Sequence, residues 1–429
     1  MILNTILNNV QTVFKPFYDK SFVLRNIDWL IFFNILSVIF TSVFAPSDDI
    51  GYFALFAIIL TFVKLITKTG EKFEFTTADK FLLVYLMIVI ISVAGSSLFL
   101  MSLKGFFKTL TYLGFYLSVV NYLKDNRDKI KYIFISVALG VFYETIFAFL
   151  QNYGAVEEIA GWQDMSRLNP EEVMTRVYGT IKPYNPNLFG GYMLSTIPAI
   201  LALPFINKKL LPLAILGGFC SILALVFTGC RGAYIGFFFE IITLFLLTHK
   251  LLKPAYKRIL TILSGITAFV VSLIILSVTS LRARIFSIFV MRGDSSNSFR
   301  FNVYNSCIDM FKDNWLLGIG CGNQNFREIY GLYMKTGFDA LSAYNIYLET
   351  AVESGIFALI AFIGFLAVNL YKSVKFILSN DSKDKIFVLC ALVSVVGMLM
   401  HGFVDTVFFR PQIQFNFWIM MGIIRVFTR

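Results

Sequence analysis

The chain has 429 residues, of which 57% are hydrophobic and only 15% charged, and its mean hydropathy is +0.74. Because soluble domains carry far more charge, this composition excludes an ordinary soluble protein. The net charge of +11 does not indicate a nucleic-acid partner, since Lys and Arg are also abundant in the cytoplasmic loops of membrane proteins. Apolar runs long enough to cross a bilayer recur along the chain and predict a polytopic membrane protein.

The apolar runs have the length of helices rather than of barrel strands, so we expect an all-α fold. The apolar runs and the long polar segments divide the chain into six parts, 1–26, 27–152, 153–186, 187–279, 280–345 and 346–429. The first part is a cytoplasmic segment, the third and fifth are extracytoplasmic loops, and the others are membrane regions. The twelve predicted transmembrane helices lie near 27–45, 50–67, 79–99, 104–123, 130–152, 187–206, 210–228, 232–249, 257–279, 346–371, 385–403 and 412–427.

The positions of the basic residues predict the orientation of these helices. With the N-terminus in the cytoplasm, 23 of the 37 Lys and Arg residues fall at cytoplasmic ends, and the C-terminus is also cytoplasmic. Lysine dominates the cytoplasmic set, whereas arginine dominates the opposite side. Arginine can bind phosphate through bidentate hydrogen bonds. The nine extracytoplasmic arginines are Arg167, Arg176, Arg231, Arg282, Arg284, Arg292, Arg300, Arg327 and Arg410.

The segment 280–345 is a long loop with features of ordered structure. Apolar residues at helical spacing predict a helix over 300–312, lying on or near the outer membrane surface. The glycines of 316–326 resemble a phosphate-binding loop but lack its Lys-Ser/Thr ending, so we interpret them as a turn. Cys307 and Cys321 share this loop, and a disulfide between them is possible.

Arg231 stands between two spans in the stretch TGCRGA, 228–233, at the start of the second span. Small neighbours allow close approach, and a helix N-terminus together with a guanidinium favours an anion. The alternative is an interfacial arginine that pairs with a carboxylate. Arg300 opens the predicted loop helix, and its alternative interpretation is an exposed loop arginine, whereas Arg282, Arg284 and Arg292 are expected to meet lipid phosphates.

Two pairs of ionisable residues are candidates for acid–base chemistry. His401 and Asp405 are four residues apart and would share a helical face, and Arg410 closes the loop that follows. Glu349 and Glu353 have the same spacing at the entrance of a span, where Arg231 or Arg300 could pair with them. Either pair could instead be structural. No nucleotide-binding motif or cluster of metal ligands is present, so we expect no cofactor and no metal.

Several segments together resemble the O-antigen ligase and polymerase family of bacterial membrane proteins. They are NPNLFGGYML (185–194), FTGCRGAYIGF (227–237), the helix of Arg300 with WLLGIGCGNQNF, AYNIYLETAVESG (343–355) and HGFVDTVFFRPQ (401–412). The resemblance implies a fold similar to GT-C glycosyltransferases, in the bacterial cytoplasmic membrane. It also implies metal-independent, inverting transfer from a polyprenyl-diphosphate-linked glycan to a lipid or glycan acceptor, among membrane lipids.

The resemblance also implies roles for single residues. Arg231 and Arg300 correspond to arginines that bind diphosphate, and within the matching segments we expect substrate contacts from Arg410, Asn185, Asn187 and Asn345. Where ligases of the family carry histidine before this last asparagine, the present chain has Tyr344, a poor base.

Tyr344, Glu349, Glu353, His401 and Asp405 are therefore the catalytic candidates. The amino-acid sequences of two segments are most similar to a branch of the family named for bicarbonate transport. This similarity leaves an anion transporter as one alternative. A non-catalytic scaffold that binds the glycan lipid is the other.

Overall fold

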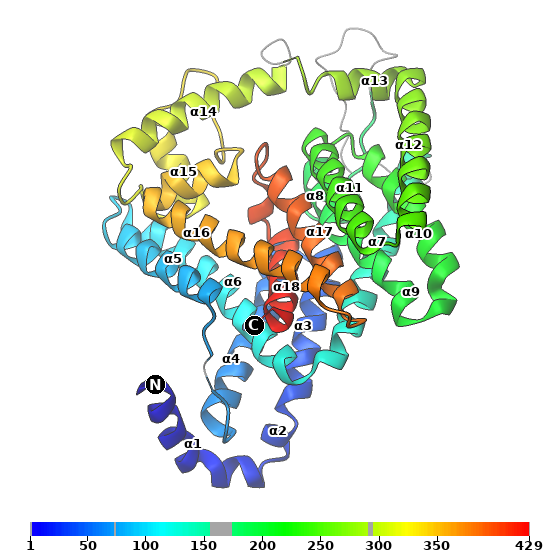
Figure 1. The fold of residues 1–429 in the computed structure, drawn as a ribbon. Coiled ribbons are helices and arrows are strands. Elements are labelled where there is room, and N and C mark those ends of the chain that lie inside the picture. Colours follow the sequence, from blue (N-terminus) through cyan, green and yellow to red (C-terminus); the bar gives the residue numbers. More distant parts are fainter. Residues whose placement is uncertain (1, 73, 155–173, 291–294, 429) are drawn as a thin grey trace.

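A computed structural model describes residues 2–72, 74–154, 174–290 and 295–428, and this part of the chain contains helices and no strands. Each of the twelve expected spans contains a helix (Figure 1). The helices are α1 Ile2–Lys20, α2 Phe22–Arg25, α3 Ile27–Phe44, α4 Ser47–Thr67, α5 Thr77–Ala94, α6 Phe99–Asp125, α7 Ile130–Asn152, α8 Pro186–Thr196, α9 Leu203–Ile206, α10 Leu211–Phe227, α11 Arg231–Leu251, α12 Pro254–Ser277, α13 Thr279–Phe286, α14 Ser295–Asp313, α15 Asn323–Tyr330, α16 Ile346–Ser379, α17 Lys385–His401 and α18 Pro411–Phe427.

The protein is a multi-pass membrane protein, and nine helical stretches among the described residues are long and apolar enough to cross a bilayer. The sequence prediction of twelve spans adds α6, α17 and α18. Of these, α17 is apolar but short, α6 carries Lys104 and Lys108, and α18 carries several polar side chains. Twelve spans therefore remain a prediction.

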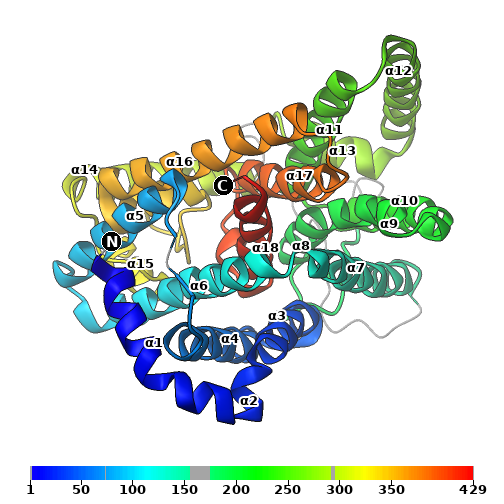
Figure 2. The same ribbon diagram turned by 60° about the horizontal axis from the view of Figure 1, so that its bottom comes forward.

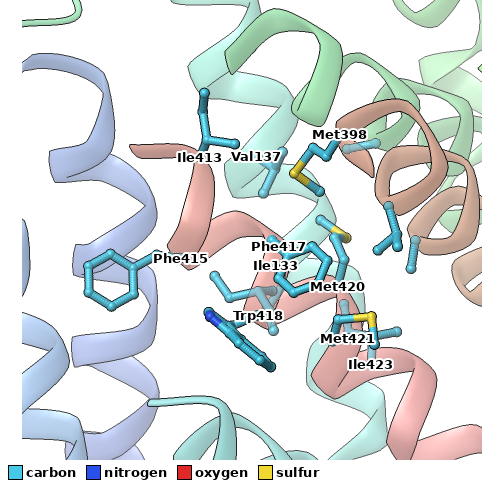
Figure 3. Packing of buried hydrophobic residues seen from close by; sticks show 14 of the residues in the cluster. Ile133, Val137, Met398, Ile413, Phe415, Phe417, Trp418, Met420, Met421 and Ile423 are labelled. Carbon is cyan, nitrogen blue, oxygen red and sulfur yellow. The ribbon is translucent and has the colours of Figure 1, made fainter. Parts of the chain in front are cut away.

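The polar character of α18 is explained by its position in the middle of the bundle. Every residue from Gln412 to Val426 is buried, and Phe417 and Trp418 pack among helices from both halves of the chain (Figure 3). A helix surrounded by protein needs hydrogen-bond partners for its polar groups rather than an apolar surface. Asn416 Nδ2 accordingly donates to Ser195 O at 2.8 Å, and Gln412 Nε2 donates to Lys182 O at 3.0 Å.

The two ends of α18 distinguish the two ends of the bundle. At its last turn Arg425 Nε lies 2.7 Å from Asp79 Oδ2, and Arg425 Nη2 donates to Glu74 O. Glu74 lies in the connection between α4 and α5. Glu71 lies in the same connection and pairs with the buried Lys64 and with Lys124. A lysine-rich network thus lies at one end of α18, and the loop that precedes α18 lies about 26 Å away at the other.

The helix α12 stands apart from the rest of the bundle at its edge (Figure 2). None of its residues is buried, and it touches mainly α11 and α13. The short α13 that follows turns back over the end of the bundle where α11 begins, so this arm brings residues 279–286 toward Arg231.

The expected helix in the long loop is confirmed as α14, which lies at the opposite end of the molecule from α1 (Figure 1). Val303, Met310 and Phe326 are buried in a small core of their own that joins α14, α15 and the start of α16. The disulfide considered for this loop is absent, because Cys307 lies in that core and Cys321 packs against α5 and α6. Arg167 and Arg292 lie outside the described residues.

Candidate functional site: an arginine-lined cavity

The hairpin between α10 and α11 is built from small residues because other side chains approach it closely. Gly229 has φ +60°, and a Cβ there would lie 3.1 Å from Arg176 Cγ. A Cβ on Gly232 would lie 2.5 Å from His401 Cδ2. Glycine at these two positions therefore lets Arg176 and His401 reach the start of α11, where Arg231 is the first helical residue.

A cavity of about 200 Å³ opens at this point, between the start of α11, α13, α14 and the loop before α18. Four arginines and one aspartate are the charged residues among those described in its lining, which gives these side chains a net charge of +3. The polar lining residues are Arg176, Asn187, Cys230, Arg231, Arg284, Ser296, Asn297, Arg300, Tyr304 and Asp405.

Neutral oxygen atoms position three of the four guanidinium groups. Arg176 Nε donates to Thr228 O at 2.7 Å, and Arg284 Nε donates to Gly229 O at 2.7 Å. Arg231 Nη1 donates to Ser287 Oγ at 3.0 Å, just after α13. Burial, together with the charge of Arg284, lowers the pKa of Arg176 to about 10, so this side chain is still protonated at neutral pH.

Asp405 contacts the fourth arginine, Arg300, and links it through Asn187 to Arg176. Its Oδ2 lies 3.5 Å from Arg300 Nη2 and accepts a hydrogen bond from Asn187 Nδ2 at 3.1 Å. Asn187 Oδ1 in turn accepts from Arg176 Nη2 at 2.6 Å. The guanidinium of Arg300 also lies 5.7 Å from the centre of the Tyr344 ring, a cation–π distance, and its buried Nε has no hydrogen-bond partner among the described residues.

His401 and Asp405 do not share a helical face as expected, because α17 ends at His401 and a turn through Gly402 follows. The imidazole is buried, and its Nε2 lies 3.7 Å from Cys230 Sγ. The carboxylate of Asp405 instead turns to Asn187 and Arg300, so the two predicted partners contact different groups at one site.

The carboxylates of Glu349 and Glu353 lie outside the cavity lining. Glu349 Oε2 accepts a hydrogen bond from Ala343 N, and Glu353 Oε1 accepts one from Gly322 N. Within the described part of the chain, neither pairs with Arg231 or Arg300, which were considered as partners. Both side chains tie the long loop to α16.

Three predicted substrate contacts also lie away from the cavity. Asn185 and Asn345 are the N-cap residues of α8 and α16, where each side chain accepts two backbone hydrogen bonds. Arg410 is exposed and precedes α18. Of the residues expected to contact substrate, Arg231, Arg300 and Asn187 line the cavity, as does Asp405.

The sequence analysis missed two of the four arginines. Arg284 was assigned to a patch facing lipid phosphates, but it is buried in the cavity lining, whereas its neighbour Arg282 is exposed as expected. Arg176 was noted only as one of the extracytoplasmic arginines. The preference for arginine on that side was the signal that could have found both.

The fold and the cavity define a multi-pass membrane protein with an arginine-lined cavity at one end of its helix bundle. Residues 216–363, about a third of the chain, match the protein-family model described as O-antigen ligase, so this part of the chain is similar to that family. The matched range holds Arg231, Arg284 and Arg300, and leaves out Arg176 and Asp405. No curated protein matches the chain. Nothing in the match supports the bicarbonate-transporter branch.

Proposed function

We propose that the protein transfers a glycan from a polyprenyl diphosphate carrier to a lipid or glycan acceptor at the extracytoplasmic face of a bacterial cytoplasmic membrane. The observation that carries this proposal is the convergence of four arginines on one cavity at the end of the bundle. The match to the O-antigen ligase family supports the same chemistry, since three of these arginines lie within the matched range.

A diphosphate fits the cavity by charge and by hydrogen-bonding geometry. Guanidinium groups offer paired N–H donors to phosphate oxygens, and the N-terminus of α11 adds backbone N–H groups and the positive end of its dipole. When the bond between sugar and diphosphate breaks, negative charge develops on the leaving oxygen. Positive groups already in place stabilise that charge most effectively, and the reaction needs no nucleotide.

Asp405 is our candidate for the general base that removes the proton of the acceptor hydroxyl. It is the carboxylate among the described lining residues, and its Oδ2 faces Arg300. Burial and the nearby Asp405 raise the pKa of the Tyr344 phenol, so this residue stays protonated and acts through its ring on Arg300. Direct attack of the acceptor opposite the diphosphate would invert the anomeric centre.

The proposed orientation places the cavity outside and the lysine network of Lys64, Lys68 and Lys124 in the cytoplasm, with both termini. We expect alkaline phosphatase, which folds only outside the cytoplasm, to be active when inserted at the exposed Leu332 and inactive when fused after Arg429. A fluorescent protein fused after Arg429 should show the opposite result. An inactive phosphatase at Leu332 in a stably inserted protein would refute this orientation.

The proposal is tested with purified full-length protein in proteoliposomes that contain a polyprenyl diphosphate oligosaccharide and a lipid-linked sugar. We expect release of polyprenyl diphosphate together with a glycosylated acceptor, followed by thin-layer chromatography and mass spectrometry. Failure to bind or consume the donor, with acceptors of both classes present, would contradict the proposal.

Tyr344 favours one second candidate, a scaffold that holds the glycan lipid without reacting. It occupies the position where ligases of the resembled family carry histidine, and its ring contacts Arg300 rather than providing a base. Tight donor binding without turnover in the same proteoliposomes, even after addition of native membrane extract as a source of acceptor, would support the scaffold instead.

A further inference from the structure

Cys230 is placed in the cavity lining next to a base. It is the N-cap residue of α11, and its Sγ lies 3.7 Å from His401 Nε2. A helix N-terminus and nearby cations stabilise a thiolate over a thiol, and an imidazole within reach can take the proton. Arg176 and Arg231 line the same cavity, so the surroundings of this sulfur are positively charged.

The other four cysteines lack this combination. None of them lines the cavity. Burial and the neighbouring Glu353 raise the pKa of the Cys321 thiol to about 12, and burial with Glu349 raises that of Cys307 further. Cys220 and Cys390 lie within the apolar helices α10 and α17. A thiol held in its protonated form reacts slowly with electrophiles.

We propose that Cys230 and His401 form a modification site for small anionic electrophiles of the thiosulfonate and disulfide classes. The Cys230 proton passes to His401 Nε2, and the thiolate attacks the divalent sulfur of the reagent. A new S–S bond forms as the old sulfur–sulfur bond breaks, and a sulfinate leaves from a thiosulfonate. From a disulfide a thiolate leaves, and it recovers the proton from His401.

The product is a mixed disulfide inside a cavity of about 200 Å³, which leaves little room for a second anion. If the proposed function holds, modification therefore switches off donor binding, and a thiol reductant restores it. This consequence rests on the proposed function, whereas the reactivity of Cys230 does not.

The test uses the purified full-length protein and 2-sulfonatoethyl methanethiosulfonate, with adducts counted by intact mass and located by peptide mapping. We expect a single rapid adduct, on Cys230. This adduct should form about tenfold faster or more than the adduct of the cationic trimethylammonioethyl analogue, because the arginines attract anions. Each rate is first divided by the rate of the same reagent with a small free thiol. The variant C230S should lose this adduct, H401N should slow its formation, and the matched variants C307S and C321S should keep it.

Inorganic diphosphate separates the two proposals. Labelling that slows as diphosphate is added supports both, and labelling that diphosphate leaves unchanged contradicts the proposed function while the modification site stands. As a control, all five thiols should react after denaturation. If Cys230 in the same folded protein carries no adduct, the modification site is overturned. A rapid adduct that persists in C230S would overturn it as well.

Discussion

Replacing Arg300 with alanine is expected to lower the rate of glycan transfer by about 100-fold or more, because one preorganised charged donor to the leaving diphosphate is lost. The side chain lines the cavity, and its buried Nε has no hydrogen-bond partner among the described residues, so this donor can bind a phosphate oxygen. The measurement is the initial rate of polyprenyl diphosphate release in proteoliposomes, at equal amounts of inserted protein.

The matched control is Arg327→Ala, which removes an arginine from the same long loop. Arg327 is exposed, pairs with Asp339 at 3.3 Å and does not line the cavity, so its loss should leave the rate unchanged. Arg300→Lys should recover only part of the activity, because an ammonium keeps the charge but not the planar fork. Parental rates in Arg300→Ala would show that the cavity does not bind the diphosphate during transfer.

Asp405→Asn is expected to reduce kcat by about 100-fold or more if the carboxylate removes the acceptor proton, since general bases contribute on this scale. Asparagine has nearly the same shape, and its side-chain oxygen can still accept the hydrogen bonds from Thr406 N and Val407 N that Oδ1 receives. The KM for the donor should change little. Steady-state rates at several donor and acceptor concentrations separate the two parameters.

A purely positioning role for Asp405 gives a different outcome. If the carboxylate only holds Arg300 and Asn187, the variant should raise the KM for the donor and keep a near-parental kcat. Asp339→Asn serves as the control, because that carboxylate is exposed and pairs with Arg327 outside the cavity. An unchanged kcat in Asp405→Asn would remove the proposed base.

Hydropathy was sufficient to predict the long apolar helices, because a membrane leaves few alternatives to them, but it did not predict α1, α13 or α15. It described α18 incompletely: the position of this segment was predicted, but not that Asn416 and Arg425 are buried among other helices. Burial inside a bundle depends on which helices pack together, and apolar periodicity along one segment does not contain that information.

The cavity was predicted only in part, because the sequence does not show which distant segments pack together. Arg231 and Arg300 stand in sequence stretches with their own local signals, whereas Arg176 and Arg284 reach the site only through the packing of distant segments. The capping roles of Asn185 and Asn345 were open to prediction, since asparagine directly before a helix commonly caps it. The positions of Glu349 and Glu353 depend on loop backbone that no pattern in the chain revealed.

The linkage of Asp405 with Arg300 and Asn187 has a consequence for the biosynthesis of the protein. Asp405 follows α17 in the chain, so a ribosome makes it only after Arg176, Arg231, Arg284 and Arg300 have been synthesised. The cavity consequently acquires its organising carboxylate late in membrane insertion. A partly translated intermediate holds Arg300 and Asn187 without this carboxylate, and the complete arrangement arises only when α17 and the loop after it have joined the bundle.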